Sequence, residues 1–176
     1  MKTRWIWLGM ALVAGCGDSG SGFAGIYMVT SHSRNDTACD SPGQPVTGGP
    51  TFIRFKDQDF LGVSILSGRG CASAAETECT GSTGGISIGF LGPIDGAYGS
   101  DAVFNPTGTK EACTFNHVGT RVRHTGGKNV EIREEERQGT RAVKICDIGA
   151  EVDDNLSEEG RTLPCKKLEV MTLIEL

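Results

Sequence analysis

Cysteine is the residue type with the widest chemical range in this chain. The sequence has seven cysteines, and a thiol can be acylated, can bind a metal or can pair in a disulfide. No two of them have the Cys-x2-Cys spacing that is typical of zinc sites, so we expect no metal site and no cofactor. Cys16 stands apart near the N-terminus. The other six are scattered, as disulfide cysteines are: Cys39, Cys71, Cys79, Cys113, Cys146 and Cys165.

The residues before Cys16 have the layout of an export signal. Lys2 and Arg4 precede an uncharged, mostly apolar run, which is typical of a secretory signal peptide. The run is shorter than the roughly 20 apolar residues that a membrane-spanning helix needs. The segment Val13–Cys16 (VAGC) resembles the lipobox of bacterial lipoproteins. The resemblance implies that residues 1–15 are removed and that Cys16 is lipidated. The alternative is an ordinary secretion signal followed by a coincidental cysteine.

The segment behind Cys16 is rich in glycine and serine, a composition typical of a flexible tether. We expect a lipidated tether over residues 16–23 and a single β-rich domain over residues 24–176. In many Gram-negative lipoproteins, Asp directly after the lipidated cysteine retains the protein in the inner membrane. Gly17 has that position here and Asp18 follows it, so the resemblance implies the outer membrane. Whether the domain faces the periplasm or the cell surface stays open.

Three patterns match the letters of chemical motifs but lack their structural context. Gly20–Gly25 matches the dinucleotide-binding fingerprint G-x-G-x-x-G, but it precedes a strand candidate instead of following one. Ser87 lies in a G-x-S-x-G sequence, yet its neighbours alternate as in a strand and a Gly-Pro pair follows where a helix should begin. We therefore predict no catalytic residue and no enzyme. The histidines fit no zinc spacing and are expected to be exposed: His32, His117 and His124.

Two charged segments are interpreted as solvated surface. Asp147–Glu159 is acidic but lacks the alternate-position oxygen ligands of an EF-hand loop, so we expect a solvated loop there. Glu131–Arg137 mixes acidic and basic residues, as is typical of charges that pair across neighbouring strands. A pair of catalytic carboxylates in that segment is the alternative.

Short apolar runs separated by Gly, Pro, Asn and Asp predict about nine β-strands and no helix. Glu131–Gln138 is rich in helix formers, but the alternation of Val130 and Ile132 with charged residues favours a strand. Thr125–Gly127 is a tight-turn signal between two of the runs. By residue range, the strand candidates are 26–30, 51–55, 60–66, 85–91, 112–115, 120–124, 128–133, 141–146 and 168–174.

This spacing of strands and turns predicts an all-β fold, a small antiparallel barrel or sandwich of about nine strands. The segment Gly25–Tyr27 at the start of the first strand resembles the Gly-x-Trp start of lipocalin-like barrels, with Tyr in place of Trp. The resemblance implies a barrel.

Up to three disulfides are expected to staple that domain. If the last strand pairs antiparallel with the first, Cys165 lies near Cys39. Cys71 would then close a local loop with Cys79, which leaves Cys113 for Cys146. This pairing is one hypothesis among the connectivities that six cysteines allow.

The net charge of −5 becomes −7 without Lys2 and Arg4, which argues against a nucleic-acid partner. The chain resembles the cysteine-rich outer-membrane lipoproteins of Gram-negative bacteria such as myxobacteria. That resemblance implies a non-enzymatic accessory or binding domain, held to the membrane by its lipid and bound to another envelope protein. One alternative is a lipocalin-like carrier of a small apolar ligand, and another is a hydrolase that uses Ser87. The carrier would have a cavity lined by Ile53, Phe55, Val63 and Ile65.

Overall fold

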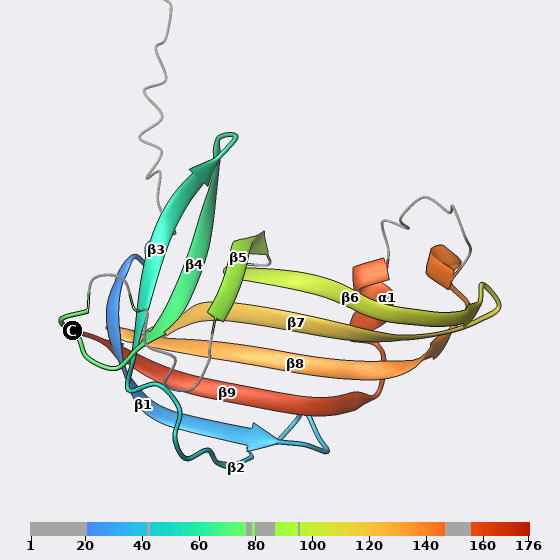
Figure 1. Cartoon of the computed structure of the whole chain (residues 1–176), viewed down its shortest axis with the longest axis horizontal. Helices are drawn as coiled ribbons and strands as arrows, with labels where there is room; N and C mark the ends of the chain where they lie inside the picture. Colours follow the sequence, from blue (N-terminus) through green and yellow to red (C-terminus); the bar gives the residue numbers. More distant parts are fainter. Residues whose placement is uncertain (1–20, 42, 77–78, 80–86, 95, 147–155) are drawn as a thin grey trace, which may run out of the picture.

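The computed structural model describes residues 21–41, 43–76, 79, 87–94, 96–146 and 156–176. These residues form one antiparallel β-sheet with two short helical segments (Figure 1). In chain order the elements are β1 (Gly25–Asn35), β2 (Gln44–Pro45), β3 (Phe52–Phe60), β4 (Val63–Cys71), β5 (Ser87–Ile94), β6 (Ala97–Thr109), β7 (Ala112–Gly126), β8 (Asn129–Arg141), the 3-10 turn η1 (Lys144–Cys146), α1 (Leu156–Arg161) and β9 (Cys165–Glu175).

The sheet closes into a ring because β1 has a partner on each edge. One edge pairs with β3 over Gly25–Met28 and with β2 over Ser33 and Arg34. The other edge pairs antiparallel with β9. From β3 to β9, each strand pairs with the next one along the chain. The predicted all-β antiparallel fold is confirmed, and the closed ring makes it a barrel.

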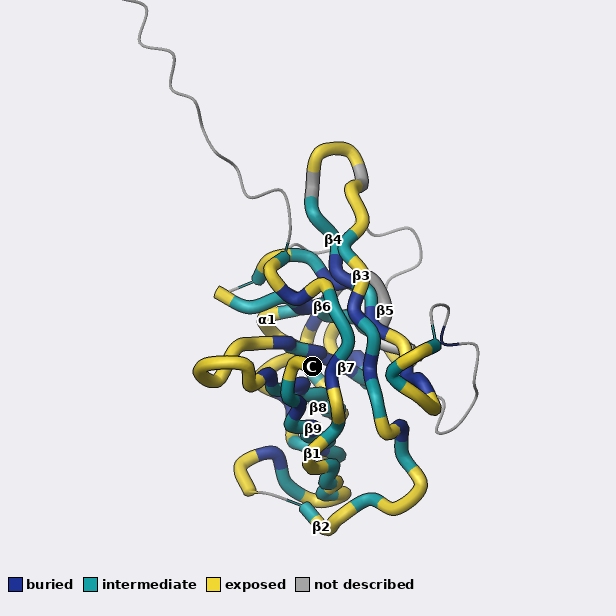
Figure 2. Tube along the Cα trace, turned by 90° about the vertical axis from the view of Figure 1, so that its left-hand side faces the viewer, coloured by how far each residue is buried: buried dark blue, intermediate teal, exposed yellow. Residues whose placement is uncertain are grey.

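The apolar core lies inside the barrel at the end where β1 begins. Tyr27 and Phe55 are almost fully buried and meet edge to face, with ring centroids 5.4 Å apart. Burying a large apolar side chain contributes about 1.5–3 kcal/mol, so this cluster supplies much of the fold's stability. In Figure 2 the buried positions lie along the strands, whereas the β3–β4 turn is exposed. The core consists of Phe23, Tyr27, Ile53, Phe55, Leu66, Leu91, Val122, Val130, Ile132, Met171 and Leu173.

The core also includes Phe23, which lies at the end of the segment expected to be a tether. Phe23 is 4% exposed and stacks on the exposed ring of His124 at 4.3 Å. Ser21, two residues earlier, donates a backbone hydrogen bond to Asp57. Ser21 and Phe23 therefore contact the barrel, because burial of the aromatic ring stabilises this position.

A second apolar cluster lies on the outer face of β6 and β7. Cys113 and Phe115 are buried there against Val143 and Leu163. They alternate with the residues of β7 that face the barrel interior, so they point outward. Val143, just before η1, and Leu163, just after α1, therefore cover the outer wall of the barrel. η1 and α1 contact β6 and β7 at the same end of these strands (Figure 1).

One strand prediction is wrong, the strand predicted at 60–66 contains the turn Leu61–Gly62, and two others are parts of a single strand. The predicted strand 141–146 is instead the end of β8 followed by η1, because the chain leaves the sheet to pack Val143 on the outer cluster. The predicted strands 112–115 and 120–124 are one strand, β7. The whole of β6 was missed because its glycines, Pro106 and Asn105 are strand breakers; a bulge between Phe104 and Thr107 accommodates these last two. The helix α1 was also not expected.

The structure contains three disulfides, and they are the pairs of our hypothesis. Cys39–Cys165 joins the loop after β1 to the start of β9, and Cys71–Cys79 closes a local loop. Cys113–Cys146 fixes η1 to β7. Each bridge therefore fastens a connecting segment to the barrel wall. Among the described residues, no helix has the length and apolar character needed to cross a membrane.

Candidate functional site

Three rows of facing residues form a charged patch on the outer wall of the barrel. In antiparallel strands, residues directly opposite each other share a face. The middle row is Asp101 on β6, Gly119 on β7 and Glu135 on β8. The flanking rows place Arg121 opposite Arg133 and His117 opposite Arg137. This face is opposite to that of Val122 and Ile132, so it points away from the core.

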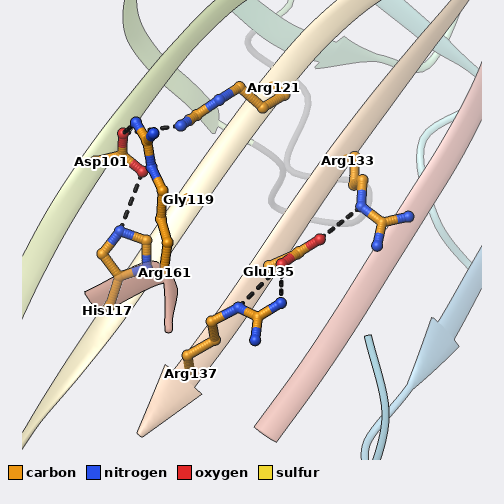
Figure 3. Close-up of a pocket in the computed structure, with 8 residues that line it drawn as sticks. All are labelled: Asp101, His117, Gly119, Arg121, Arg133, Glu135, Arg137 and Arg161. Carbon is orange, nitrogen blue, oxygen red and sulfur yellow. Dashed lines mark hydrogen bonds and ion pairs between the residues drawn. The ribbon is translucent and has the colours of Figure 1, made fainter. Parts of the chain in front are cut away.

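The patch contains a hollow of about 320 Å³, which we call the arginine hollow. Its floor is Gly119, which has no side chain to fill the space between Asp101 and Glu135. A β-carbon on Gly119 would come within 3.1 Å of an Asp101 oxygen and 3.3 Å of the His117 ring. Figure 3 shows the charged side chains converging on either side of this strand. The hollow is lined by Asp101, His117, Gly119, Arg121, Arg133, Glu135, Arg137 and Arg161.

Asp101 is the acceptor for three cationic or polar groups on one side of the hollow. Its carboxylate accepts hydrogen bonds from Arg161 at 2.5 Å, Arg121 at 2.8 Å and the His117 Nε2 at 3.0 Å. Its side chain is only 5% exposed. Burial raises its pKa, but the hydrogen bonds from Arg161 and Arg121 outweigh burial and hold the pKa below the usual range. Asp101 is therefore an anion when the protein is folded.

Glu135 has the same role on the other side. It accepts hydrogen bonds from Arg133 Nε at 2.7 Å and from Arg137 Nη2 at 2.6 Å. Burial again raises the pKa, and the two guanidinium groups outweigh it, so the pKa of Glu135 is lowered. The two carboxylates fix the positions of the guanidinium groups around the hollow.

His117 is a buried, neutral histidine beneath α1. Its side chain is 2% exposed, and a β-carbon on Gly160 of α1 would come within 2.5 Å of its ring. Burial lowers its pKa; Asp101 opposes this, and Arg161 and Arg121 add to it. The Nε2–H donates to Asp101, and Nδ1 is buried with no hydrogen-bond partner among the described residues. Together these contacts lock the position of Asp101.

This lowered pKa predicts how stability changes with pH. In the unfolded chain, histidine binds a proton near pH 6.5, whereas folded His117 binds its proton only at a lower pH. The unfolded state then binds more protons, so the free energy of unfolding is highest above about pH 6.5 and falls as the pH drops through that value toward the folded pKa. Urea unfolding at pH 7.5 and 5.5 measures this loss.

Two histidine variants identify the group responsible for that loss. His117→Gln keeps an N–H donor for Asp101 but cannot titrate, so we expect a smaller loss between the two pH values. His124→Gln changes an exposed ring and should keep the wild-type loss. Equal losses for wild type and His117→Gln would contradict the assignment.

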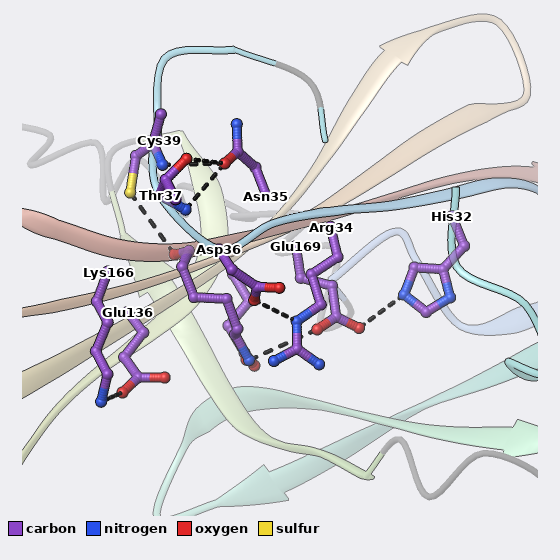
Figure 4. Close-up of polar contacts among 12 residues, drawn as sticks. His32, Arg34, Asn35, Asp36, Thr37, Cys39, Glu136, Lys166 and Glu169 are labelled. Atoms are coloured by element: carbon purple, nitrogen blue, oxygen red, sulfur yellow. Dashed lines mark hydrogen bonds and ion pairs between the residues drawn. The ribbon is translucent and has the colours of Figure 1, made fainter. Parts of the chain in front are cut away.

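A second polar cluster lies along β1, β8 and β9 (Figure 4). His32 contacts Glu169 at 2.7 Å, and its side chain is 8% exposed. Lys166 pairs with Glu136 at 2.8 Å. These groups bond to one another, and together with Cys39–Cys165 they fasten β1 to the neighbouring strands. We interpret the cluster as structural.

The structure separates the histidines that we expected to be exposed. His124 is exposed, but His117 is buried and His32 is half-buried, and their rings hydrogen-bond to Asp101 and Glu169. The expectation of exposure is therefore wrong for these two, because segments far away in the sequence cover them. The expected cross-strand pairs of Glu131–Arg137 are those of Glu131 with Arg123, Glu134 with Lys167 and Glu136 with Lys166. Glu135 instead pairs with Arg133 and Arg137 on its own strand.

Ser87 lies in β5, where its backbone pairs with Arg69 of β4; its side chain is outside the described part of the structure. Cys16 and most of Asp147–Glu159 also lie outside the described residues. Of the residues proposed to line a carrier cavity, Ile53 and Phe55 belong to the packed core. Ile65 pairs with Gln58 and so faces the other side of the sheet, which corrects its placement; the side chain of Val63 is not described.

Cys71, Glu76 and Cys79 bring three potential metal-ligating atoms within 4.8 Å of one another. The two sulfurs are bonded to each other in a disulfide, so neither is a thiolate that could bind a metal. Glu76 alone does not make a metal site.

The fold and the hollow define a disulfide-bonded antiparallel β-barrel with a basic site on its outer wall. Comparison with known proteins gave no match: no family model, no curated protein and no solved structure is significantly similar to this chain. The functional argument therefore depends on the residues themselves.

Proposed function

We propose that this chain is a lipid-anchored protein of the bacterial cell envelope, with a non-enzymatic binding domain. One observation carries the proposal: the three disulfides use six of the seven cysteines, and the seventh is Cys16. Disulfides form and persist in oxidising compartments outside the cytoplasm. Cys16, which takes part in none of these bridges, directly follows the signal-like segment. Lipidation would occur at this cysteine.

The arginine hollow supports binding rather than catalysis. Its described lining residues include no hydroxyl or thiol. The two carboxylates are held by arginines that lower their pKa, which makes them weak nucleophiles and weak bases. Arg133 and Arg137 are engaged by Glu135, so they are fixed as hydrogen-bond donors. A rigid, concave arrangement of donors suits the recognition of a ligand or an envelope partner.

Lipidation is tested by replacing Cys16. We expect Cys16→Ser to abolish labelling by a palmitate analogue and to move the protein from the membrane to the soluble fraction, because membrane attachment needs the acyl chains. The double variant Cys71→Ser, Cys79→Ser is the matched control, since it removes two cysteines but keeps the anchor. Wild-type labelling and membrane association of Cys16→Ser would overturn the proposal.

The outer-membrane location has its own test. Gly17→Asp places an acidic residue directly behind Cys16, and we expect the protein to move to the inner-membrane fraction on a density gradient. Asp18→Asn, which changes the neighbouring acidic residue, should stay in the outer membrane. Cross-linking of the wild-type protein in its native envelope would then identify an associated protein.

A further inference from the structure

We infer that the arginine hollow binds the phosphoryl group of a phosphate monoester, held above Gly119 between two pairs of arginines. The inference rests on the binding half of the proposed function and is independent of the lipid anchor. It follows from the charge of the hollow, from one unfavourable cross-strand pair and from the room around that pair.

The charge of the hollow favours an anion. Four arginines line it against two carboxylates, Asp101 and Glu135, so cations outnumber anions among the lining residues. Each carboxylate is already shared by two guanidinium groups. This excess of guanidinium groups favours a strongly charged oxyanion, and a phosphate monoester carries close to two negative charges at neutral pH.

Arg121 and Arg133 are directly opposite each other on β7 and β8. Like charges in this position destabilise a sheet, and here the two side chains turn to different carboxylates, Asp101 and Glu135. No carboxylate in the described structure bridges the pair. Gly99 gives Arg121 its room, because a β-carbon there would come within 2.7 Å of the Arg121 side chain. An oxyanion between the two arginines would relieve their repulsion.

The guanidinium groups are also held in place before any ligand arrives. Arg121 donates to the carbonyl of Ser100 at 3.0 Å, and Arg137 donates to the carbonyl of Leu163 at 2.9 Å. Arg133 donates to the carbonyl of Cys39, whose loop is tied to β9 by a disulfide. Such preorganisation lowers the cost of binding, and planar guanidinium forks match the oxygens of phosphate.

The space around the arginines is large enough for a ligand bigger than a free phosphate ion. A second hollow of about 230 Å³ adjoins the first and shares Arg121 and Arg133 with it. It extends the site toward Arg123 and the turn between β5 and β6. The first hollow alone is at the lower end of the volumes of small-molecule sites. The ligand class is therefore a phosphate monoester on a sugar or on a lipid headgroup.

The test uses the full-length chain with Cys16→Ser, so that the protein can be titrated in solution. Calorimetry at constant ionic strength compares inorganic phosphate, glucose 6-phosphate and acetate. Co-sedimentation compares vesicles that contain phosphatidic acid, a monoester, with vesicles that contain phosphatidylglycerol, a diester. We expect a phosphate monoester, soluble or in vesicles, to bind at least ten-fold more tightly than acetate or the diester vesicles. The soluble and vesicle arms identify which source is preferred.

Variants locate the binding at the hollow. Arg133→Gln should weaken monoester binding about ten-fold or more, and Arg133→Lys should restore part of it. Arg161→Gln, on α1, provides a second variant if Arg133→Gln fails to fold, as judged by its near-ultraviolet circular dichroism. Arg69→Gln makes the same charge change at an exposed site on β4 and should bind as wild type does. The inference is overturned if no monoester binds, if acetate binds equally well, or if the hollow variants match Arg69→Gln.

Discussion

Replacing both Cys39 and Cys165 with serine should lower the free energy of unfolding by about 5 kcal/mol, the largest single effect that we expect. This disulfide spans 126 residues, and cross-linking so long a segment removes much of the entropy of the unfolded chain. It also holds β1 against β9 at the seam that closes the ring. Without it, the barrel keeps only the hydrogen bonds and packing of that seam.

The control is the bridge Cys71–Cys79, which spans only 8 residues. The same entropy argument gives about 2.5 kcal/mol for its removal by serine at both positions. Urea unfolding of the two double variants, monitored by circular dichroism without reductant, measures the difference. If removing the short bridge lowers the free energy of unfolding as much as removing the long one, chain entropy does not account for how these disulfides stabilise the barrel.

Asp101→Asn should cost about 3 kcal/mol, the second largest effect. Removing one partner of a buried ion pair typically costs about 3–5 kcal/mol, and Asp101 is 5% exposed. We expect the lower end of this energy range because the side chains of Arg121 and Arg161 are 22% and 42% exposed and so remain partly hydrated. The amide would leave these two cations close together without an anion between them.

Asp36→Asn is the matched control for Asp101→Asn. Asp36 pairs with Arg34 at 2.7 Å, but both side chains are at least half exposed. Solvent screens such a pair, so we expect little change in stability. Thermal unfolding of both variants at pH 7 provides the comparison. A similar shift in the two melting temperatures would show that Asp101 is not the centre of a buried network.

The strands that bury one clear face could be predicted from the sequence. Val130 and Ile132 alternate with charged residues, and β8 has this pattern despite its helix-forming composition. The cysteine pairs followed from two assumptions, that the first and last strands are neighbours and that Cys71 and Cys79 close a local loop. By contrast, β6 could not be found from local pattern, because Asn105 and Pro106 are placed at a bulge that only its pairing with β7 creates.

The arginine hollow was missed because its parts depend on tertiary contacts. Asp101 is on the strand that was not predicted, and His117 is buried only because α1 covers it. One signal was available in the sequence. The turn at Thr125–Gly127 sets the register between β7 and β8, and this register places Arg121 opposite Arg133. Like charges opposite each other destabilise a hairpin, so this pair is the feature of the sequence that distinguishes the face.

The burial of Phe23 has a consequence for how far the barrel can move. Only residues 17–20 separate Cys16 from Ser21, which is already bonded to Asp57. Five steps of extended chain reach at most about 18 Å, whereas β7, with its 15 residues, is about 50 Å long. With acyl chains on Cys16, the chain between the membrane and the barrel would be much shorter than the barrel itself. It would then sample a thin layer of solution directly above the bilayer, where lipid headgroups are concentrated.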